Sequence, residues 1–93
     1  MIESTIEAFR AELIEQGYEV GEREWEAGQV NHMHTHPFDA RGLITRGTFT
    51  VTHAEGAKTY RPGDQFRLEA DIEHEEVIGP EGVSFISGRR AKG

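Results

Sequence analysis

The feature that most restricts the fold is a series of short β-like runs that fills the chain after Gly17. The runs are rich in β-branched and aromatic residues or alternate between apolar and polar positions, and glycine, proline and acidic residues separate them. They cover residues 18–26, 30–36, 40–46, 48–53, 58–60, 65–68, 73–78 and 83–87, with turns expected at 55–57, 62–64 and 79–82. About seven or eight short strands in one small chain predict a mainly β fold, a small antiparallel β-barrel or jelly roll.

A single helix is expected before the strands. Ile6, Phe9 and Leu13 recur at spacings of three and four, and a serine–glutamate capping box precedes them. We expect residues 1–17 to form an N-terminal α-helix that packs on a β-barrel domain of residues 18–93, within a single domain overall.

The small core expected of this chain indicates that something else stabilises it. The chain has 93 residues, of which 35% are hydrophobic, so a bound metal, a partner subunit or both are expected to help. Exposed strand edges favour a homodimer as that partner. Because cysteine is absent, any metal must be held by nitrogen and oxygen ligands.

The charge balance excludes several classes of partner. Acidic residues outnumber basic ones by 17 to 10, for a net charge of −7, so neither nucleic acid nor an anionic membrane is expected to bind. No apolar run approaches the roughly 20 residues of a membrane span, and the first residues do not resemble a secretory signal. We therefore expect a soluble, cytoplasmic protein, with a basic tail at residues 89–93 that frays.

The histidines are the strongest chemical signal. Three of the five lie within residues 32–36, and strand alternation would place His32, His34 and His36 on one face in steps of about 7 Å. Two such imidazoles can reach one ion at nitrogen–metal distances of about 2 Å. His74 is the candidate third imidazole, because it lies on a distant strand. His53, beside a turn, is expected to be a solvated surface residue.

Two segments resemble the motifs of the cupin family. Residues 34–37 (His-Thr-His-Pro), followed by Gly47 eleven residues after His36, are similar to the first cupin motif. Residues 62–64 (Pro-Gly-Asp), followed by His74, are similar to the second. The resemblance extends over roughly residues 20–88 and is closest to small single-domain cupins of the RmlC-like superfamily, in an uncharacterised subgroup. It implies a cupin barrel that binds a divalent metal ion, zinc, iron, nickel or manganese, through three histidines: His34, His36 and His74.

The sequence departs from the first motif at Ala40, where the family has a metal-binding glutamate. Asp39 lies next to this place, but alternation turns it to the opposite face, where it is expected to pair with Arg41. It would reach the metal only if a bulge shifted the phase of the strand.

Other residues could complete the site. Glu76 is in phase with His74, which makes it a candidate pocket carboxylate, as a ligand or a general base. His32 is a candidate fourth ligand or a residue at the mouth of the pocket. The small side chains at Ala40 and Gly42 would leave space beside the ion. Trp25 is expected in the core or an interface.

Further expectations concern the rest of the pocket. Phe38 and Ile44 would form its apolar wall, and Arg41 and Arg46 are the positive charges expected nearby.

These observations favour a metal-binding small cupin of unassigned activity that takes a small-molecule ligand. The alternative is a three-histidine metal-dependent enzyme, a dioxygenase or an isomerase or lyase, acting on a small oxygen-bearing molecule. A third hypothesis is a structural barrel that holds no metal.

Overall fold

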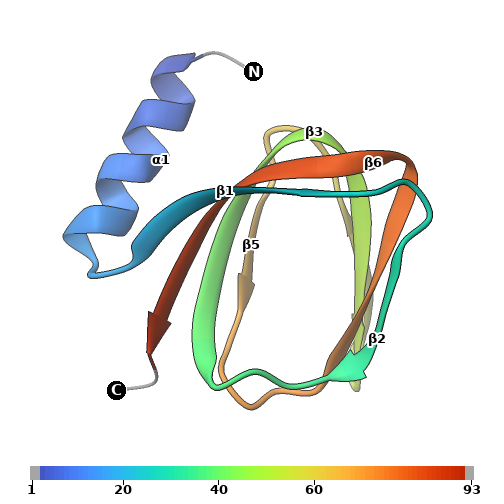
Figure 1. Ribbon diagram of the computed structural model, residues 1–93. Helices are drawn as coiled ribbons and strands as arrows, with labels where there is room; N and C mark the ends of the chain where they lie inside the picture. Colours follow the sequence, from blue (N-terminus) through green and yellow to red (C-terminus); the bar gives the residue numbers. More distant parts are fainter. Residues whose placement is uncertain (1–2, 92–93) are drawn as a thin grey trace.

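The computed structural model describes residues 3–91, which form one helix followed by six strands. The elements are α1 (Glu3–Glu15), β1 (Glu19–Trp25), β2 (Val30–His34), β3 (Phe38–His53), β4 (Gly56–Tyr60), β5 (Gln65–Leu68) and β6 (His74–Ala91). All the pairings among these strands are antiparallel and join them into one sheet, which curves round to enclose the interior of a barrel (Figure 1). The expected fold class, a small antiparallel β-barrel with one N-terminal helix, is confirmed.

Two long strands, β3 and β6, make up most of the barrel. They pair from Phe38↔Ala91 to Thr52↔Glu75, with β-bulges or other register shifts near the middle. The prediction of seven or eight short strands was therefore wrong in number, because pairs of expected strands are continuous in the structure. Segment 79–82 is part of a bend in β6 rather than a hairpin turn (Figure 1).

The C-terminal end of β6 is paired with β3 as far as Ala91, and with β1 as far as Arg89. Arg89 lies opposite Glu19 of β1 and Ala40 of β3, so the expectation of a fraying tail was wrong for residues 89–91. Residues 92–93 lie outside the described residues. This pairing brings the last basic residues of the strand to the same end of the barrel as the start of β3.

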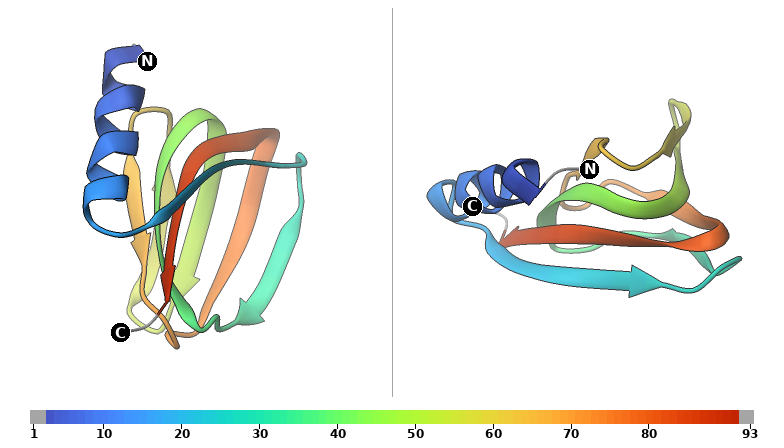
Figure 2. Two further views of the ribbon diagram at one scale, coloured as in Figure 1. Left: turned by 60° about the vertical axis from the view of Figure 1, so that its left-hand side comes forward. Right: turned by 90° about the horizontal axis from the view of Figure 1, so that it is seen from above.

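Alternation along β3 and β6 produces two hydrophobic clusters, one on each face of the sheet. Ile44 and Phe85 point into the barrel and pack with Phe49, while the adjacent Leu43 and Ile86 point outward. The outward cluster is covered by α1, which lies outside the barrel (Figure 2). Its further members are Phe9 and Leu13 of the helix, together with Tyr18.

A buried arginine connects the helix to the sheet. Arg41 is 7% exposed, and its guanidinium stacks over the Phe9 ring at 5.2 Å. Its guanidinium donates to Gln16 Oε1 at 2.7 Å and Gln65 Oε1 at 2.9 Å, and it pairs with Glu12 at 2.9 Å. Charge-assisted contacts of this kind are among the stronger polar interactions in a protein.

The expected pairing of Asp39 with Arg41 was wrong. Asp39 accepts a hydrogen bond from the backbone N–H of Ala70 at 2.9 Å and lies 3.8 Å from Arg90. The helix supplies Arg41 with its carboxylate instead, and that partner belongs to a distant part of the sequence.

Replacing Arg41 with methionine is expected to lower the free energy of unfolding by about 1–3 kcal/mol. The methionine keeps the apolar contact with the helix but leaves three polar side chains without their donor. Urea denaturation measures the change, and Arg61→Met is the matched control, since no side-chain hydrogen bond or ion pair holds Arg61 within residues 3–91. Equal stabilities of the two variants would contradict this role of Arg41.

Candidate metal centre

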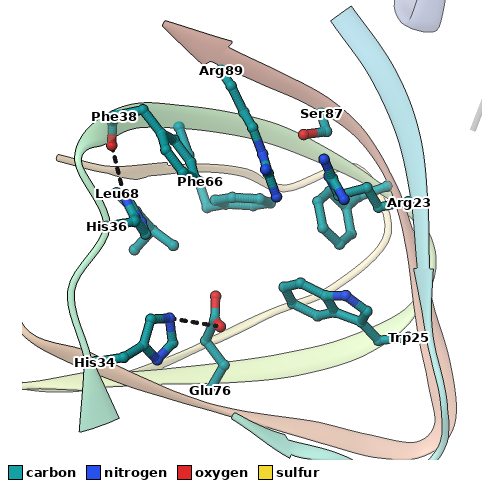
Figure 3. A pocket seen from close by; sticks show the side chains of 12 residues that line it. Arg23, Trp25, His34, His36, Phe38, Phe66, Leu68, Glu76, Ser87 and Arg89 are labelled. Atoms are coloured by element: carbon teal, nitrogen blue, oxygen red, sulfur yellow. Dashed lines mark hydrogen bonds and ion pairs between the residues drawn. The ribbon is translucent and has the colours of Figure 1, made fainter. Parts of the chain in front are cut away.

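A cavity of about 260 Å³ lies inside the barrel (Figure 3). His34 of β2, Glu76 of β6 and His36, between β2 and β3, line one side of it. Its apolar lining includes Trp25, Phe38, Ala40, Phe66, Leu68 and Phe85. The cavity thus combines metal-ligating groups with a mainly aromatic wall.

A β-bulge in β2 decides which histidines reach this cavity. Asn31 pairs with Glu76 and His34 with His74, so β2 has one more residue in this interval than β6. The extra residue breaks the alternation between Asn31 and His34. The expectation that His32 shares a face with His34 and His36 was therefore wrong, and the His32 side chain is exposed.

Three side chains come close enough together to hold a metal ion. His34, His74 and Glu76 each offer one ligand atom, and these atoms lie within 4.8 Å of one another. The carboxylate of Glu76 is 3.8 Å from His34 Nε2 and 3.9 Å from His74 Nε2. An ion bound at about 2 Å from each ligand would hold such atoms roughly 3–4 Å apart, so the group needs only small shifts.

A backbone carbonyl contacts the Nδ1 atom of each of three imidazoles, those of His34, His36 and His74. In each, Nδ1 lies within hydrogen-bond distance of a carbonyl oxygen two residues away, so Nδ1–H is the donor and Nε2 keeps its lone pair. Metal-binding histidines commonly have such a partner, which fixes the tautomer and the ring orientation. The distances are 2.6 Å for His34 to His32, 2.6 Å for His36 to Phe38 and 3.0 Å for His74 to Ile72.

His74 Nε2 is the most informative atom of the site. The side chain is 1% exposed, and this nitrogen is the one fully buried side-chain nitrogen or oxygen among residues 3–91 that has no hydrogen-bond partner. Leaving such an atom unsatisfied costs about 1–3 kcal/mol. A metal ion would accept its lone pair, so the donor set fits a bound cation.

Glu76 is held in place by a chain of amides. Its carboxylate is 4% exposed and accepts a hydrogen bond from Asn31 Nδ2 at 3.1 Å. Asn31 Oδ1 in turn accepts one from Gln29 Nε2 at 2.9 Å. This carboxylate would supply the negative ligand that is missing at Ala40, and its phase with His74 was the sequence signal for it.

His36 lies at the edge of the group. Its ring centroid is 5.0 Å from that of His74 and 6.3 Å from that of His34, and it stacks on Phe38 at 4.3 Å. Burial lowers the pKa of His36 below its ordinary value of 6.5, against the opposing effect of the hydrogen bond to the Phe38 carbonyl. A neutral ring is the form that binds metal. Its role as the third imidazole ligand stays a prediction.

The remaining expected residues lie in several places. Asp39 faces away from the cavity, toward Arg90, and His53 is exposed, as expected. The space expected at Gly42 is filled by the Phe66 ring, because a Cβ there would lie 2.0 Å from it. Ile44 belongs to the core cluster.

Trp25 belongs to both the core and the cavity. Its ring packs edge-on against Phe85 at 5.1 Å and Phe49 at 6.2 Å, and it also lines the cavity. The expectation placed it in the core or an interface and did not include the second role.

The sequence reasoning missed the two arginines of the cavity. Arg41 lies under the helix and Arg46 donates to the Glu81 carbonyl at 2.6 Å, whereas Arg23 and Arg89 line the cavity. Strand alternation would have placed Arg23 in phase with Trp25, and Arg89 in phase with Phe85, had β6 been recognised as continuous to its end.

Comparisons with known proteins show the fold. A protein of unknown function from Rhizobium leguminosarum bv. viciae superposes with a TM-score of 0.76, at 16% identity over 83% of this chain and 73% of that one. A cupin-2 domain protein from Shewanella frigidimarina has a TM-score of 0.65, at 16% identity over 81% and 71%. A cupin protein from Bacteroides fragilis has a TM-score of 0.65, at 20% identity over 83% and 68%.

These similarities identify the barrel as a cupin fold, as the sequence motifs implied. No protein-family model and no curated protein matches the chain. No helix among residues 3–91 is long and apolar enough to span a membrane.

Proposed function

We propose that this domain binds one divalent metal ion inside its barrel, through His34, His74 and Glu76, with His36 as the third imidazole. The observation that carries the proposal is the buried His74 Nε2, which has no hydrogen-bond partner among residues 3–91 and lies 3.9 Å from the Glu76 carboxylate. A cation would satisfy the nitrogen and compensate the buried negative charge together.

The donor set restricts the metal to a few elements. Three imidazole nitrogens and one carboxylate oxygen suit several divalent transition metals, among them zinc, iron, nickel and manganese, and the absence of cysteine removes the thiolate sites. A metal bound here would act as a Lewis acid at the coordination positions that no protein ligand occupies. Because the aromatic wall of the cavity lies beside these coordination positions, we expect a small molecule to occupy them.

Binding and sensing of a small ligand is the function we favour, and catalysis is the second candidate. The cavity beside the ligating groups is the observation that favours catalysis, because a substrate there would lie next to both the metal and Glu76. Glu76 would then be either a metal ligand or a general base. Oxygen uptake and product formation by the metal-loaded protein, with a panel of small diketones, thiols and carboxylic acids, separate a dioxygenase or isomerase from a binding module.

The metal proposal is tested by elemental analysis of protein loaded with zinc, iron, nickel or manganese and then desalted. We expect one metal ion per chain in the wild type. Glu76→Gln and His36→Ala should each weaken the metal affinity about 10–100-fold, since each variant loses a ligand or its orientation. His53→Ala is the matched control and should bind metal as the wild type does, because His53 is exposed. Wild-type protein that takes up none of the four metals would refute the proposal.

The expected homodimer and cytoplasmic location stay predictions. Val30 and Val77 pair across β2 and β6 with 41% and 39% exposure, which offers an apolar surface to a second copy. Sedimentation equilibrium of the metal-loaded protein measures the oligomeric state.

A further inference from the structure

The geometry points to a second binding determinant in the same cavity: Arg23 and Arg89 form an oxyanion site, so the ligand is a small organic anion. Its carboxylate or phosphate end would lie between the two guanidinium groups, and an oxygen-bearing group at its other end would reach the metal. Only the contact between the ligand and the metal rests on the proposed metal site.

The two arginines come from strands that pair directly. In the β1–β6 register, Arg23 lies opposite Phe85 and Glu19 opposite Arg89. Residues two apart on a strand share a face, so Phe85, Ser87 and Arg89 follow one another along the cavity wall. Figure 3 shows both guanidinium groups extending into the cavity on the side away from His34.

No carboxylate of residues 3–91 forms an ion pair with either arginine. In the part of the chain that the structure describes, no acidic side chain lies within the 4.0 Å of an ion pair to either guanidinium, although the protein has 17 acidic residues. Burial and the charge of Arg23 lower the pKa of Arg89, and Glu19, directly opposite Arg89 on β1, opposes them. Two like charges that line one cavity without an ion-pair partner form a favourable place for an anion.

The surroundings of the pair prepare it for a bound anion. The Arg89 guanidinium stacks on the Phe38 ring at 4.6 Å, which restricts its orientation. The Ser87 side chain is 5% exposed and its hydroxyl faces the cavity beside both arginines (Figure 3). A guanidinium binds carboxylate or phosphate through two parallel hydrogen bonds, and a hydroxyl adds a third donor.

The size and lining of the cavity restrict the carbon skeleton of the ligand. At about 260 Å³ the cavity is smaller than the roughly 300–1,000 Å³ of common ligand pockets, which favours a ligand smaller than a nucleotide. Between the arginines and the histidines the wall consists of Trp25, Phe66 and Leu68. A ligand that matches this lining has a short apolar chain, which would lie against the aromatic wall. Its anionic group would face the arginines, and an oxygen donor at its other end would face the histidines.

The test is calorimetric titration of zinc-loaded protein with succinate, glutarate, glycerol phosphate and the neutral succinamide. We expect at least one anion to bind and the diamide to fail. Arg23→Gln and Arg89→Gln should each weaken binding of that anion about tenfold, which corresponds to about 1.4 kcal/mol. Arg89→Lys should fall between, because lysine keeps the charge but not the paired hydrogen bonds. A preference for glycerol phosphate over the dicarboxylates would identify the group as phosphate.

Arg61→Gln is the matched control, since it removes the same charge from a loop outside the cavity and should leave the affinity unchanged. Both pocket arginines are exposed, so their variants are expected to fold. Absence of binding by every anion up to about 10 mM would overturn the inference. So would equal affinity of the wild type and the Arg23→Gln, Arg89→Gln double variant.

Metal content of the same samples separates this inference from the proposed metal function. If the wild type takes up no metal but binds an anion in a manner that depends on Arg23 and Arg89, the metal site is refuted and the oxyanion site stands. If one metal ion binds per chain and the anion affinity is the same in the Arg23 and Arg89 variants as in the wild type, the oxyanion site alone is refuted.

Discussion

Replacing His74 with alanine is expected to abolish the stabilisation that a metal ion gives to this protein. A ligand present at about a thousand times its dissociation constant stabilises the folded state by about 4 kcal/mol. In a domain of this size, that corresponds to a rise of roughly 15–30 °C in melting temperature. The variant should lose the whole rise, because its central buried ligand is gone. Thermal denaturation with and without added zinc, iron, nickel or manganese measures the difference.

A His74→Leu variant distinguishes a ligand role from a packing role. Leucine removes the buried nitrogen that has no partner and keeps most of the volume of the side chain. The loss of the hydrogen bond from Nδ1 to the Ile72 carbonyl offsets part of this gain. The metal-free variant should therefore be about as stable as the metal-free wild type, whereas the metal-loaded wild type should be far more stable than either. A metal-dependent rise that persists in both His74 variants would show that the ion binds elsewhere.

Replacing Gly47 with alanine is expected to destabilise the barrel by about 3–5 kcal/mol, a large part of the roughly 5–15 kcal/mol that holds a small domain together. Gly47 has a φ of 72°, in the left-handed region. A Cβ there would lie 1.9 Å from the carbonyl oxygen of Gly82, which is backbone and cannot rotate away. Urea denaturation of the metal-free protein measures the loss.

Gly21→Ala is the matched control for this substitution. Gly21 also lies on a strand, but a Cβ there meets no atom within 4 Å and its φ is not left-handed. The free energy of unfolding of Gly21→Ala should stay within about 0.5 kcal/mol of the wild-type value. If Gly47→Ala were equally mild, the close approach of β3 and β6 at their bends would not be needed for the fold.

Much of the candidate metal centre could be predicted from local sequence alone. His34 and His74 were recognised from strand spacing and from the cupin motifs, and Glu76 from its phase with His74. His74 and Glu76 lie on a regular segment of β6, where the side-chain direction follows from position, and His34 follows the bulge in β2. The prediction for His32 was wrong because a β-bulge is a property of the β2–β6 pairing, which single-strand periodicity cannot show.

The sequence by itself determined the β-rich character of the chain, its N-terminal helix, the nitrogen and oxygen chemistry of any metal site and two of its histidines. Each of these depends on residue type and short-range spacing. Only the tertiary structure decided that β3 and β6 run unbroken, that Arg41 takes its carboxylate from the helix, and that Arg23 and Arg89 share a cavity with the histidines. Those features depend on the register between strands far apart in the chain, and register is set by packing on both faces of the sheet at once.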